Sequence, residues 1–391
     1  MSRMRLCVAS HKECWQSPDG RWMSSGGFPR QMEGLASVFD SLSLVVVAGA
    51  PRAGGTALPR SASVTALRSP SGSDARRKAS IARHLRYYLG ALAAAFRDAD
   101  AVHVPLPGDI SLLGLLTALR MRKPLIARYG GSWAGDAETT LMNRITKACL
   151  RRFAGGRNVM LVTGEGAAPP ARGIEWIFST ALTRDELAAI RPAAHAALHD
   201  PPALVYAGRL SREKGVDVLL EAMALLRREG KTPMPVLQVC GDGPERGALE
   251  RLSTALGVGD LATFAGQLDR TALGAAFLAA DLCIQPSRTE GFSKAWLDAM
   301  AYGIPVVASE VGAARSVLGA AGDRGWLVAP GDAAALAQLL RQLLASRSHD
   351  WSAMRARCRA YAEGRTLEAW ASEIEARCVA AWGRPTRDRE P

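Results

Sequence analysis

Residues 282–308, LCIQPSRTEGFSKAWLDAMAYGIPVVA, decide the fold of this 391-residue chain. Leu282–Gln285 is a short apolar run, Ser293 stands where a helix can begin, and Pro305–Ala308 is a second apolar run. A strand, a helix and another strand in this order predict a βαβ unit, from which parallel sheets are built. We therefore expect an α/β protein whose ligands bind beyond the carboxyl ends of its strands.

The same alternation of strands and helices continues in both directions. In the second half of the chain, further strands are predicted at Ala203–Ala207, Val236–Cys240, Ala262–Phe264 and Gly325–Val328. Toward the N-terminus we predict strands at Arg5–Ala9, Leu42–Ala48, Ala101–Pro105, Pro124–Tyr129 and Val159–Thr163, and helices at Pro29–Phe39, Ala79–Arg97, Ser111–Arg120 and Thr139–Phe153. A final helix is predicted at Ala356–Trp382.

A segment rich in Pro and Ala separates two such series and indicates two domains. We expect an N-terminal domain at residues 1–180, a linker at 181–202, a C-terminal domain at 203–355 and a closing helical segment at 356–391. No repeat of 20–50 residues is visible, which excludes a solenoid.

The net charge of +12 is confined to the first half of the chain. Residues 1–180 hold 24 Lys and Arg against 12 Asp and Glu, whereas residues 181–391 hold 25 of each. The basic residues cluster at 76–86, 120–123 and 144–157. Such a surface suits anionic lipid, an acidic substrate or nucleic acid, and it is equally what solvated helices of an Arg-rich composition give.

Neither a membrane span nor a leader is expected from the sequence. The longest apolar stretches are far shorter than the ~20 residues that cross a bilayer. The N-terminal sequence reaches the polar residues His11 and Lys12 before the apolar core of a signal peptide could form. The seven cysteines are scattered without a C-x-x-C pair, which predicts reduced thiols in a cytoplasmic protein.

Two glycine-bearing loops follow predicted strands of the second domain. In the first, Gly208–Gly215, Arg209 and Lys214 lie five residues apart and suit one diphosphate, although an exposed basic turn would look the same. In the second, Gly241 and Gly243 precede a helix near Glu245, as in a phosphate-binding turn or an ordinary tight turn.

The loop after Gln285 carries the strongest signal. Glu290 precedes the helix, Ser293 is placed to cap it, and the amides near Phe292 then point outward as an anion site. Asp298 lies more than one turn into the helix. Two carboxylates that flank a helix start suit a ligand with sugar, phosphate and ribose in series.

These segments, with Phe264–Gly266, resemble the donor-binding half of retaining, nucleotide-sugar-dependent glycosyltransferases of the GT-B fold, group 1, especially glycosyltransferase family 4. The resemblance covers about residues 200–345 and is looser over residues 1–180. It implies two Rossmann-like domains that face each other across a cleft. The last helix would return to the first domain.

The resemblance also implies roles for individual residues. Arg209 and Lys214 would neutralise the donor diphosphate, while Glu290 holds hydroxyls of the donor sugar. The donor would further contact Gly208, Gly241, Gly243, Gly266, Gln267, Gly291, Phe292 and Ser293. Asp298 would bind the ribose; the family usually has Glu there, one methylene longer.

In the first half, Ser24–Pro29 follows the first predicted strand and resembles the family's Gly-rich loop, so Gly26 and Gly27 would face the donor. Tyr129, in the segment Arg128–Trp133, stands where many relatives have His. Its hydroxyl would position the donor sugar in place of that His. His103 is a second candidate to replace that His. The simpler interpretation is that His103 is a core histidine.

The primary interpretation is a hexosyltransferase that moves a sugar from a UDP- or GDP-sugar to a glycan or lipid-linked acceptor with retention of configuration. No cofactor and no metal ion are expected, because no Asp-x-Asp occurs and cations can stabilise the leaving diphosphate. The basic first half would bind the acceptor and an anionic membrane surface, in the synthesis of cell-surface polysaccharide or lipopolysaccharide. The alternatives are an epimerase or hydrolase of the same fold, and a catalytically degenerate partner subunit. Nucleic acid is not an expected partner, because the basic clusters lack interleaved aromatics.

Overall fold

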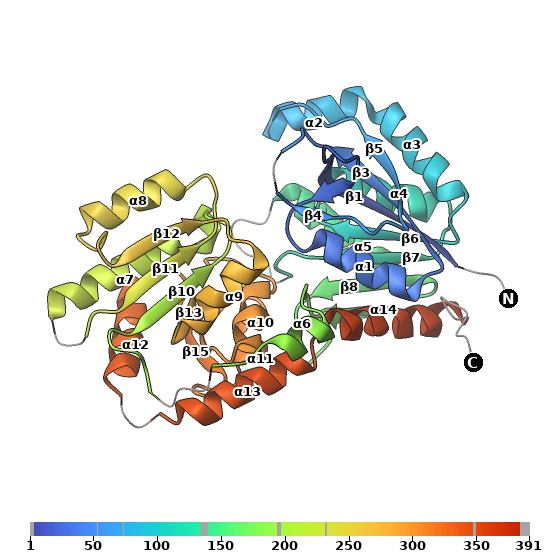
Figure 1. The fold of residues 1–391 in the computed structure, drawn as a ribbon. Helices are drawn as coiled ribbons and strands as arrows, with labels where there is room; N and C mark the ends of the chain where they lie inside the picture. The colour runs from blue at the N-terminus through green and yellow to red at the C-terminus, as the bar shows by residue number, and fades with distance from the viewer. Residues whose placement is uncertain are drawn as a thin grey trace. The chain divides into compact units, whose positions relative to one another are not determined.

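The computed structural model describes residues 4–52, 54–72, 74–133, 140–193, 197–230, 233–346 and 349–383. The chain divides into two compact units (Figure 1). One unit comprises Met1–Ala181 and Leu367–Pro391, and the other comprises Leu182–Thr366. Position 139 of an expected helix and positions 194–196 of the expected linker lie outside the described residues.

In the described part of the N-terminal unit, nine strands form one sheet. Seven of them are parallel, in the order β5-β3-β1-β6-β7-β8-β9, while β2 and β4 extend the sheet antiparallel from the end of β1. The strands are β1 (Arg5–Gln16), β2 (Trp22–Ser24), β3 (Ser41–Ala48), β4 (Thr56–Ala57), β5 (Ser63–Leu67), β6 (Ala101–Leu106), β7 (Leu125–Tyr129), β8 (Asn158–Thr163) and β9 (Ile174–Ile177).

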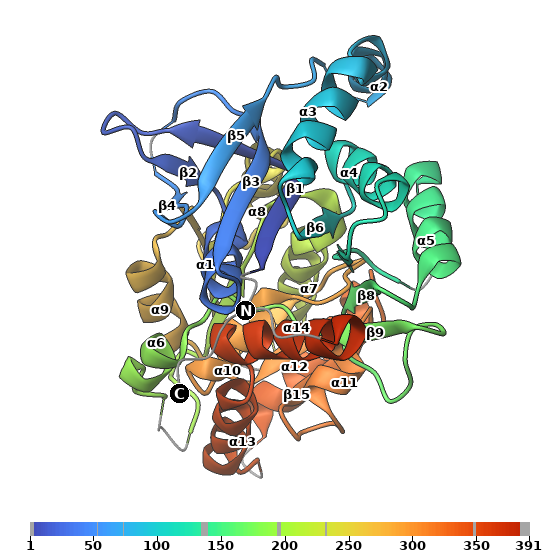
Figure 2. The same ribbon diagram turned by 90° about the vertical axis from the view of Figure 1, so that its right-hand side faces the viewer.

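Helices cover this sheet with their apolar sides. Tyr88 and Phe96 of α3 and Leu115 of α4 are buried in one core with residues of β1, β6 and β7. Helix α14 contacts both α1 and β8, so the end of the chain packs in the N-terminal unit (Figure 2). The helices are α1 (Phe28–Val38), α2 (Asp74–Arg83), α3 (Leu85–Arg97), α4 (Asp109–Arg120), α5 (Leu141–Phe153) and α14 (Leu367–Trp382).

The described strands of the C-terminal unit form a six-stranded parallel sheet of order β12-β11-β10-β13-β14-β15. Its strands are β10 (Ala203–Ala207), β11 (Val236–Cys240), β12 (Ala262–Gly266), β13 (Leu282–Gln285), β14 (Val306–Ser309) and β15 (Gly325–Val328). The helices are α6 (Arg184–Ala189), the 3-10 turn η1 (Arg212–Lys214), α7 (Val216–Glu229), α8 (Arg246–Ala255), α9 (Arg270–Leu278), α10 (Lys294–Ala301), α11 (Ala314–Leu318), α12 (Ala333–Ala345) and α13 (Trp351–Glu363).

Each sheet has one point at which the strand order reverses. In the N-terminal unit the chain adds β3 and β5 on one side of β1 and then β6 on the other. In the C-terminal unit it adds β11 and β12 on one side of β10 and then β13 on the other. Ligands of open α/β sheets bind at the carboxyl ends of the two strands beside such a reversal. The fold therefore indicates the ends of β1 and β6, and those of β10 and β13.

The predicted α/β class is confirmed, and several element bounds are corrected. The single helix expected at Ala79–Arg97 is two helices, because the backbone of His84 (φ −108°, ψ 20°) leaves the helical region. The single helix expected at Ala356–Trp382 is also divided, at Gly364, a residue that weakens helices. Strand β1 runs to Gln16 rather than Ala9 and forms a hairpin with β2.

Other features of the described chain concern its cysteines and its helix lengths. All seven cysteines are free thiols, and all except the half-buried Cys149 are buried. Among the described residues, no helix combines the length and the apolar character that a bilayer crossing requires.

Candidate active site

The loops that follow β10 and β11 touch along their backbones. The amide of Leu210 donates to the carbonyl of Asp242 at 2.9 Å. A Cβ atom on Gly241 would lie 1.8 Å from the Gly208 oxygen, and one on Gly243 would lie 2.2 Å from the Leu210 oxygen. Only glycine permits backbones to approach this closely. The structure therefore brings Gly208, Gly241 and Gly243 together at one edge of the sheet.

The loop after β12 joins this edge through the same kind of contact. The amide of Gly241 donates to the carbonyl of Gly266 at 2.8 Å. Gly266 has φ +71°, in the left-handed region that favours glycine, and Gln267 beside it is exposed. A Cβ atom on Gly266 would lie 3.1 Å from Nη1 of Arg246. The loop thus offers backbone groups and one guanidinium to a ligand at this end.

Lys214 and Glu290 form an ion pair between η1 and the loop after β13. Their side chains keep only 23% and 13% of their surface exposed. The prediction placed Lys214 on a diphosphate and Glu290 on a sugar, without a contact between them. In the structure the two side chains contact each other, so a ligand that binds one of them also lies next to the other.

A second ion pair, which the sequence did not indicate, braces the same two loops. Arg288 donates from Nη1 and Nη2 to the two carboxylate oxygens of Asp217, each at 2.7 Å. Burial raises the pKa of Asp217, but the Arg288 guanidinium outweighs this and holds that pKa below its ordinary value. Gly215 has φ +67°, and a Cβ atom added to it would lie 2.1 Å from the Pro286 oxygen. Glycine at this position therefore allows the turn to pack against the loop after β13. The Arg288–Asp217 pair therefore holds together the turn that carries Lys214 and the loop that carries Glu290.

The start of α10 presents unpaired backbone donors beside Glu290. The amides of Gly291, Phe292 and Ser293 donate to no residue in the described ranges, although all three residues are buried. The expectation that the Ser293 hydroxyl caps the helix is wrong: Ser293 occupies the N-cap position, but its side chain makes no capping bond. The amides of residues 291–293 therefore remain for a ligand at the start of α10.

The side chain of Phe292 packs inside the protein and is not exposed to a ligand. Its ring, 6% exposed, packs on Trp296 with the centroids 5.9 Å apart. Only its backbone amide is therefore available to a ligand.

Asp298 lies in α10 with its carboxylate half-buried. Burial raises its pKa and the carboxylate of Glu186 adds to this, whereas the cations Arg270 and Lys294 lower it. Arg270 is itself paired with Glu186 at 3.0 Å. This carboxylate is placed among polar groups of α6, α9 and α10, where it can accept hydroxyl hydrogen bonds.

Arg209 differs from Lys214 in its surroundings. Its side chain is exposed and makes no hydrogen bond or ion pair with any described residue. Its carbonyl accepts the hydroxyl of buried Tyr206 at 2.9 Å, and burial raises the pKa of that hydroxyl. The backbone of Arg209 is therefore fixed while its guanidinium stays free in the described structure.

In the N-terminal unit, Gly26 and Gly27 precede α1. The short strand β2 lies between β1 and this loop, and Ser24 is the last residue of β2. Gly26 has φ +71° and lies beside Lys12, whose Nζ is 4.0 Å from an added Cβ. Gly27 is the N-cap residue of α1 and has no side chain to fill that position.

Tyr129 ends β7 and is buried. Its ring, 1% exposed, packs edge-on against Trp133 at 5.8 Å, and Lys147 Nζ lies 5.6 Å from the ring centroid. The role of its hydroxyl toward a donor stays a prediction.

His103 lies inside the sheet. Its Nδ1 is 3.1 Å from the carbonyl of Ile126, and its buried Nε2 has no partner among the described residues. Burial lowers its pKa to about 3, with a further contribution from Arg128. This environment is that of a neutral core histidine.

Three of the basic side chains expected on the surface have structural contacts. Arg77 pairs with Asp109, Lys123 donates to the Ala99 carbonyl at 2.7 Å, and Lys147 is buried and donates to the Trp133 carbonyl at 3.2 Å. The remaining arginines of these clusters, Arg76, Arg83, Arg86, Arg120, Arg122, Arg144, Arg151, Arg152 and Arg157, are exposed. The basic surface is real, but it is smaller than the sequence suggested.

Comparisons with known proteins place these features in a wider context. Residues 190–365 match the family model described as glycosyl transferases group 1. A D-inositol 3-phosphate glycosyltransferase from Catenulispora acidiphila is 38% identical over 152 residues, which cover 36% of this chain and 35% of the relative. The chain thus matches about a third of the length of such curated relatives.

Similarity in fold extends over nearly the whole chain. Sucrose-phosphate synthase from Thermosynechococcus elongatus superposes with a TM-score of 0.73, at 21% identity, over 97% of this chain and 100% of that one. HepE from Anabaena, solved with UDP and glucose, gives 0.71 at 17% identity, over 97% and 100%. The predicted GT-B fold of two Rossmann-like domains is therefore confirmed.

Proposed function

Because residues 190–365 carry the signature of group 1 glycosyltransferases and the chain has the GT-B fold, we propose that this protein is a nucleotide-sugar-dependent hexosyltransferase. It moves a sugar from a UDP- or GDP-sugar to a glycan or lipid-linked acceptor, with retention of configuration, in cell-surface polysaccharide or lipopolysaccharide synthesis. One observation carries the proposal. The Lys214–Glu290 pair stands beside three unpaired amides at the carboxyl ends of β10 and β13.

The donor diphosphate fits the positive part of this site. Lys214 and the free guanidinium of Arg209 provide cations, and the amides of residues 291–293 provide donors at the start of α10. Charge builds on the diphosphate as the glycosidic bond of the donor breaks. Donors fixed before the reaction stabilise that charge without reorganisation, and removal of one typically costs about 10²–10³ in rate. We propose that these groups meet this need without a metal ion.

Glu290 has a different task, because its carboxylate accepts hydrogen bonds. We propose that it holds hydroxyls of the donor sugar while Lys214 turns toward the phosphate. Their pairing in the free protein keeps both side chains in place before the ligand arrives. The departing phosphate then accepts the proton of the acceptor hydroxyl, on the same face of the sugar, which gives retention. This mechanism needs no covalent enzyme intermediate.

The nucleoside half of the donor is assigned to the other end of the same edge. Asp298 accepts the ribose hydroxyls, and the backbone of Gly266 and Gln267 faces the base. Asp reaches one methylene less far than the Glu found in relatives. The raised pKa of Asp298 accompanies its burial and does not prevent its acceptance of hydroxyl hydrogen bonds.

The acceptor and the membrane are assigned to the N-terminal unit. Helix α5 exposes Leu141 and Ile145 one turn apart, at 71% and 44% exposure, and carries exposed Arg144 and Arg152. Exposed apolar residues with arginines and no carboxylate suit the interface of an anionic lipid surface. We propose peripheral attachment there.

Donor binding tests the proposal directly. The wild-type chain is titrated in a calorimeter with UDP, GDP, UDP-sugars and GDP-sugars. Each donor that binds is then incubated with the protein, and the release of free nucleotide is measured. We expect binding of one donor class and its loss in Lys214→Ala, but not in Arg341→Ala, which removes an exposed pair with Glu229. Absence of nucleotide binding would favour a degenerate subunit. An isomerised or hydrolysed donor, with no transfer to any acceptor, would favour the epimerase or hydrolase.

A further inference from the structure

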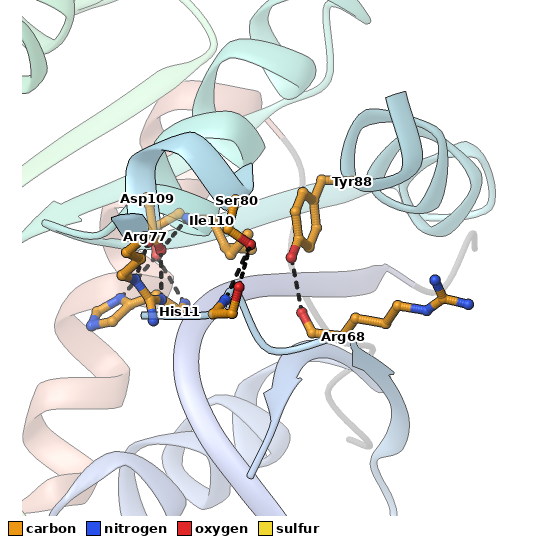
Figure 3. Close-up of polar contacts among 9 residues, drawn as sticks. His11, Arg68, Arg77, Ser80, Tyr88, Asp109 and Ile110 are labelled. Atoms are coloured by element: carbon orange, nitrogen blue, oxygen red, sulfur yellow. Dashed lines mark hydrogen bonds and ion pairs between the residues drawn. The ribbon is translucent and has the colours of Figure 1, made fainter. Parts of the chain in front are cut away.

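A polar cluster that the sequence did not indicate lies beside the carboxyl end of β6 and the irregular middle of β1, where the strand order of the N-terminal sheet reverses. His11 comes from β1, Asp109 from the start of α4 and Arg77 from α2 (Figure 3). Ser111 lies in the first turn of α4. The equivalent position of the C-terminal sheet is the candidate donor site. The cluster is therefore the place where the fold predicts a ligand of the N-terminal unit.

Local backbone geometry directs His11 into this place. The pairing of β1 with β3 shifts register between Ala9 and Glu13, as in a bulge that redirects a side chain. The imidazole packs against Gly108, where an added Cβ would lie 2.2 Å from Nδ1. Any residue other than glycine at 108 would displace the ring, so the backbone before α4 is shaped around His11.

Hydrogen bonds leave one nitrogen of this ring for a ligand. The buried hydroxyl of Ser111 lies 3.3 Å from His11 Nδ1 and also accepts the His11 backbone amide at 3.3 Å. Nε2 has no partner in the described ranges. A ligand hydroxyl both donates and accepts, so it suits Nε2 in either tautomer.

The charges around the ring indicate a neutral ligand group. Burial lowers the pKa of His11, the Asp109 carboxylate opposes this, and the cations Lys12 and Arg77 add to it. Arg77 is already neutralised, because it donates to both oxygens of Asp109 at 2.5 and 3.2 Å. Asp109 also accepts the Ile110 amide at 2.8 Å. A neutral imidazole beside a closed ion pair favours a hydroxyl over an anion.

We propose that His11 is an acceptor-binding residue of the N-terminal unit, whose Nε2 hydrogen-bonds a hydroxyl of the acceptor. This inference rests on the proposed function and names the class of group bound, a sugar or polyol hydroxyl. Ser111 and Gly108 position the ring, and the Arg77–Asp109 pair anchors α2 beside it. The interactions of Ser80 with Ser71, at 3.1 and 3.2 Å, and of Tyr88 with the Arg68 carbonyl, at 3.0 Å, tie the adjoining loop to α2 and α3.

Chemical labelling tests the site without knowledge of the natural acceptor. Diethyl pyrocarbonate modifies accessible neutral imidazoles, and mass spectrometry of the full chain locates the adduct. We expect His11 to be modified in the free protein and protected at least several-fold by methyl α-D-glucopyranoside or glycerol at saturation. His84, exposed at the junction of α2 and α3, is the internal control whose labelling stays constant. An unreactive His11, or one that neither polyol protects, overturns the proposal.

A matched pair of variants separates this inference from the proposed function. His11→Gln and His11→Ala are compared with His84→Gln for binding of the UDP- or GDP-sugar and for transfer of the sugar to octyl β-D-glucopyranoside. We expect donor binding to stay within twofold of wild type in all three variants, whereas transfer to octyl β-D-glucopyranoside falls at least tenfold in both His11 variants and is unchanged in His84→Gln. Unchanged transfer overturns the role of His11. Failure of the wild type to bind any donor overturns the proposed function instead.

Discussion

Lys214 donates a hydrogen bond to the Glu290 carboxylate across 76 positions of sequence, between the loops that follow β10 and β13. A cation for the leaving group and a carboxylate for the sugar therefore contact each other before any ligand is present. Removal of either leaves the other partly buried and unpaired.

Substitution of either member of this pair is expected to abolish most transfer. Lys214→Ala and Glu290→Ala should each lower the rate by about 10² or more, because each removes a group that faces the reacting centre. Thermal unfolding should shift little, since Arg288 and Asp217 still brace the loops. The measurement is release of the nucleoside diphosphate from the donor identified by calorimetry, beside Arg341→Ala as control. Near wild-type rates in both variants would refute the site.

Glycine at 241 and 243 is expected to be required for the C-terminal unit to fold. In Gly241→Ala the new Cβ meets the Gly208 oxygen at 1.8 Å, so the loops must separate. We expect a loss of at least ~2 kcal/mol in the free energy of unfolding and loss of donor binding. Gly247→Ala is the control, because its Cβ finds only ordinary contact at 3.5 Å inside α8, where Ala is the better helix former. Urea unfolding that ranks the two variants equally would contradict this geometry.

Much of the C-terminal unit could be predicted because its central strands are buried on both faces. Ala203–Ala207 and Leu282–Gln285 are almost entirely apolar and buried, and the structure gives both strands the predicted bounds. Strands β5 and β9, at the two ends of the parallel series of the N-terminal sheet, were not predicted, because they are short and partly exposed. Residues 63–67 of β5 alternate exposed and half-buried positions, and β9 has only four residues. A short strand with one solvent-exposed face has too few apolar residues to be recognised from the sequence.

The site was predictable as a set of positions but not as a set of contacts. The spacing of Arg209, Lys214 and Glu290 placed them at strand ends, which follows from local sequence alone. The Lys214–Glu290 pairing and the uncapped helix at Ser293 depend on rotamers that local sequence does not determine. His11 escaped notice because its partner residues, Gly108 and Ser111, lie about a hundred positions away.

The burial of His103 predicts a loss of stability in acid. Its pKa is about 3 in the folded chain and near 6.5 when unfolded, so the unfolded state binds the proton more tightly. The contribution of neutral His103 to the free energy of unfolding is fully present above about pH 6.5. It is lost as the pH decreases toward 3, by on the order of a few kcal/mol.

His103→Asn should remove this part of the pH dependence, because Asn retains a donor for the Ile126 carbonyl but does not titrate. Urea unfolding followed by tryptophan fluorescence between pH 7 and 4 should give a flatter profile for this variant than for wild type. His84→Asn, on an exposed histidine, should leave the wild-type slope unchanged. Parallel profiles for wild type and His103→Asn would show that His103 does not carry the effect.

The exposed face of α5 makes a prediction about membranes. Leu141 and Ile145 would insert into the lipid interface while Arg144 and Arg152 meet anionic headgroups, each worth about 1 kcal/mol near such a surface. We expect the wild-type chain to float with vesicles that contain phosphatidylglycerol, and less so as salt rises.

Leu141→Glu with Ile145→Glu should reduce the floated fraction several-fold, because both changes add charge where apolar side chains meet lipid. The matched control is Leu278→Glu, an exposed leucine of α9 in the C-terminal unit with 41% exposure. Calorimetric binding of the donor should be the same in all three proteins, which separates attachment from catalysis. Flotation that the α5 changes do not reduce, or that fails for wild type at every salt concentration, would count against attachment through this helix.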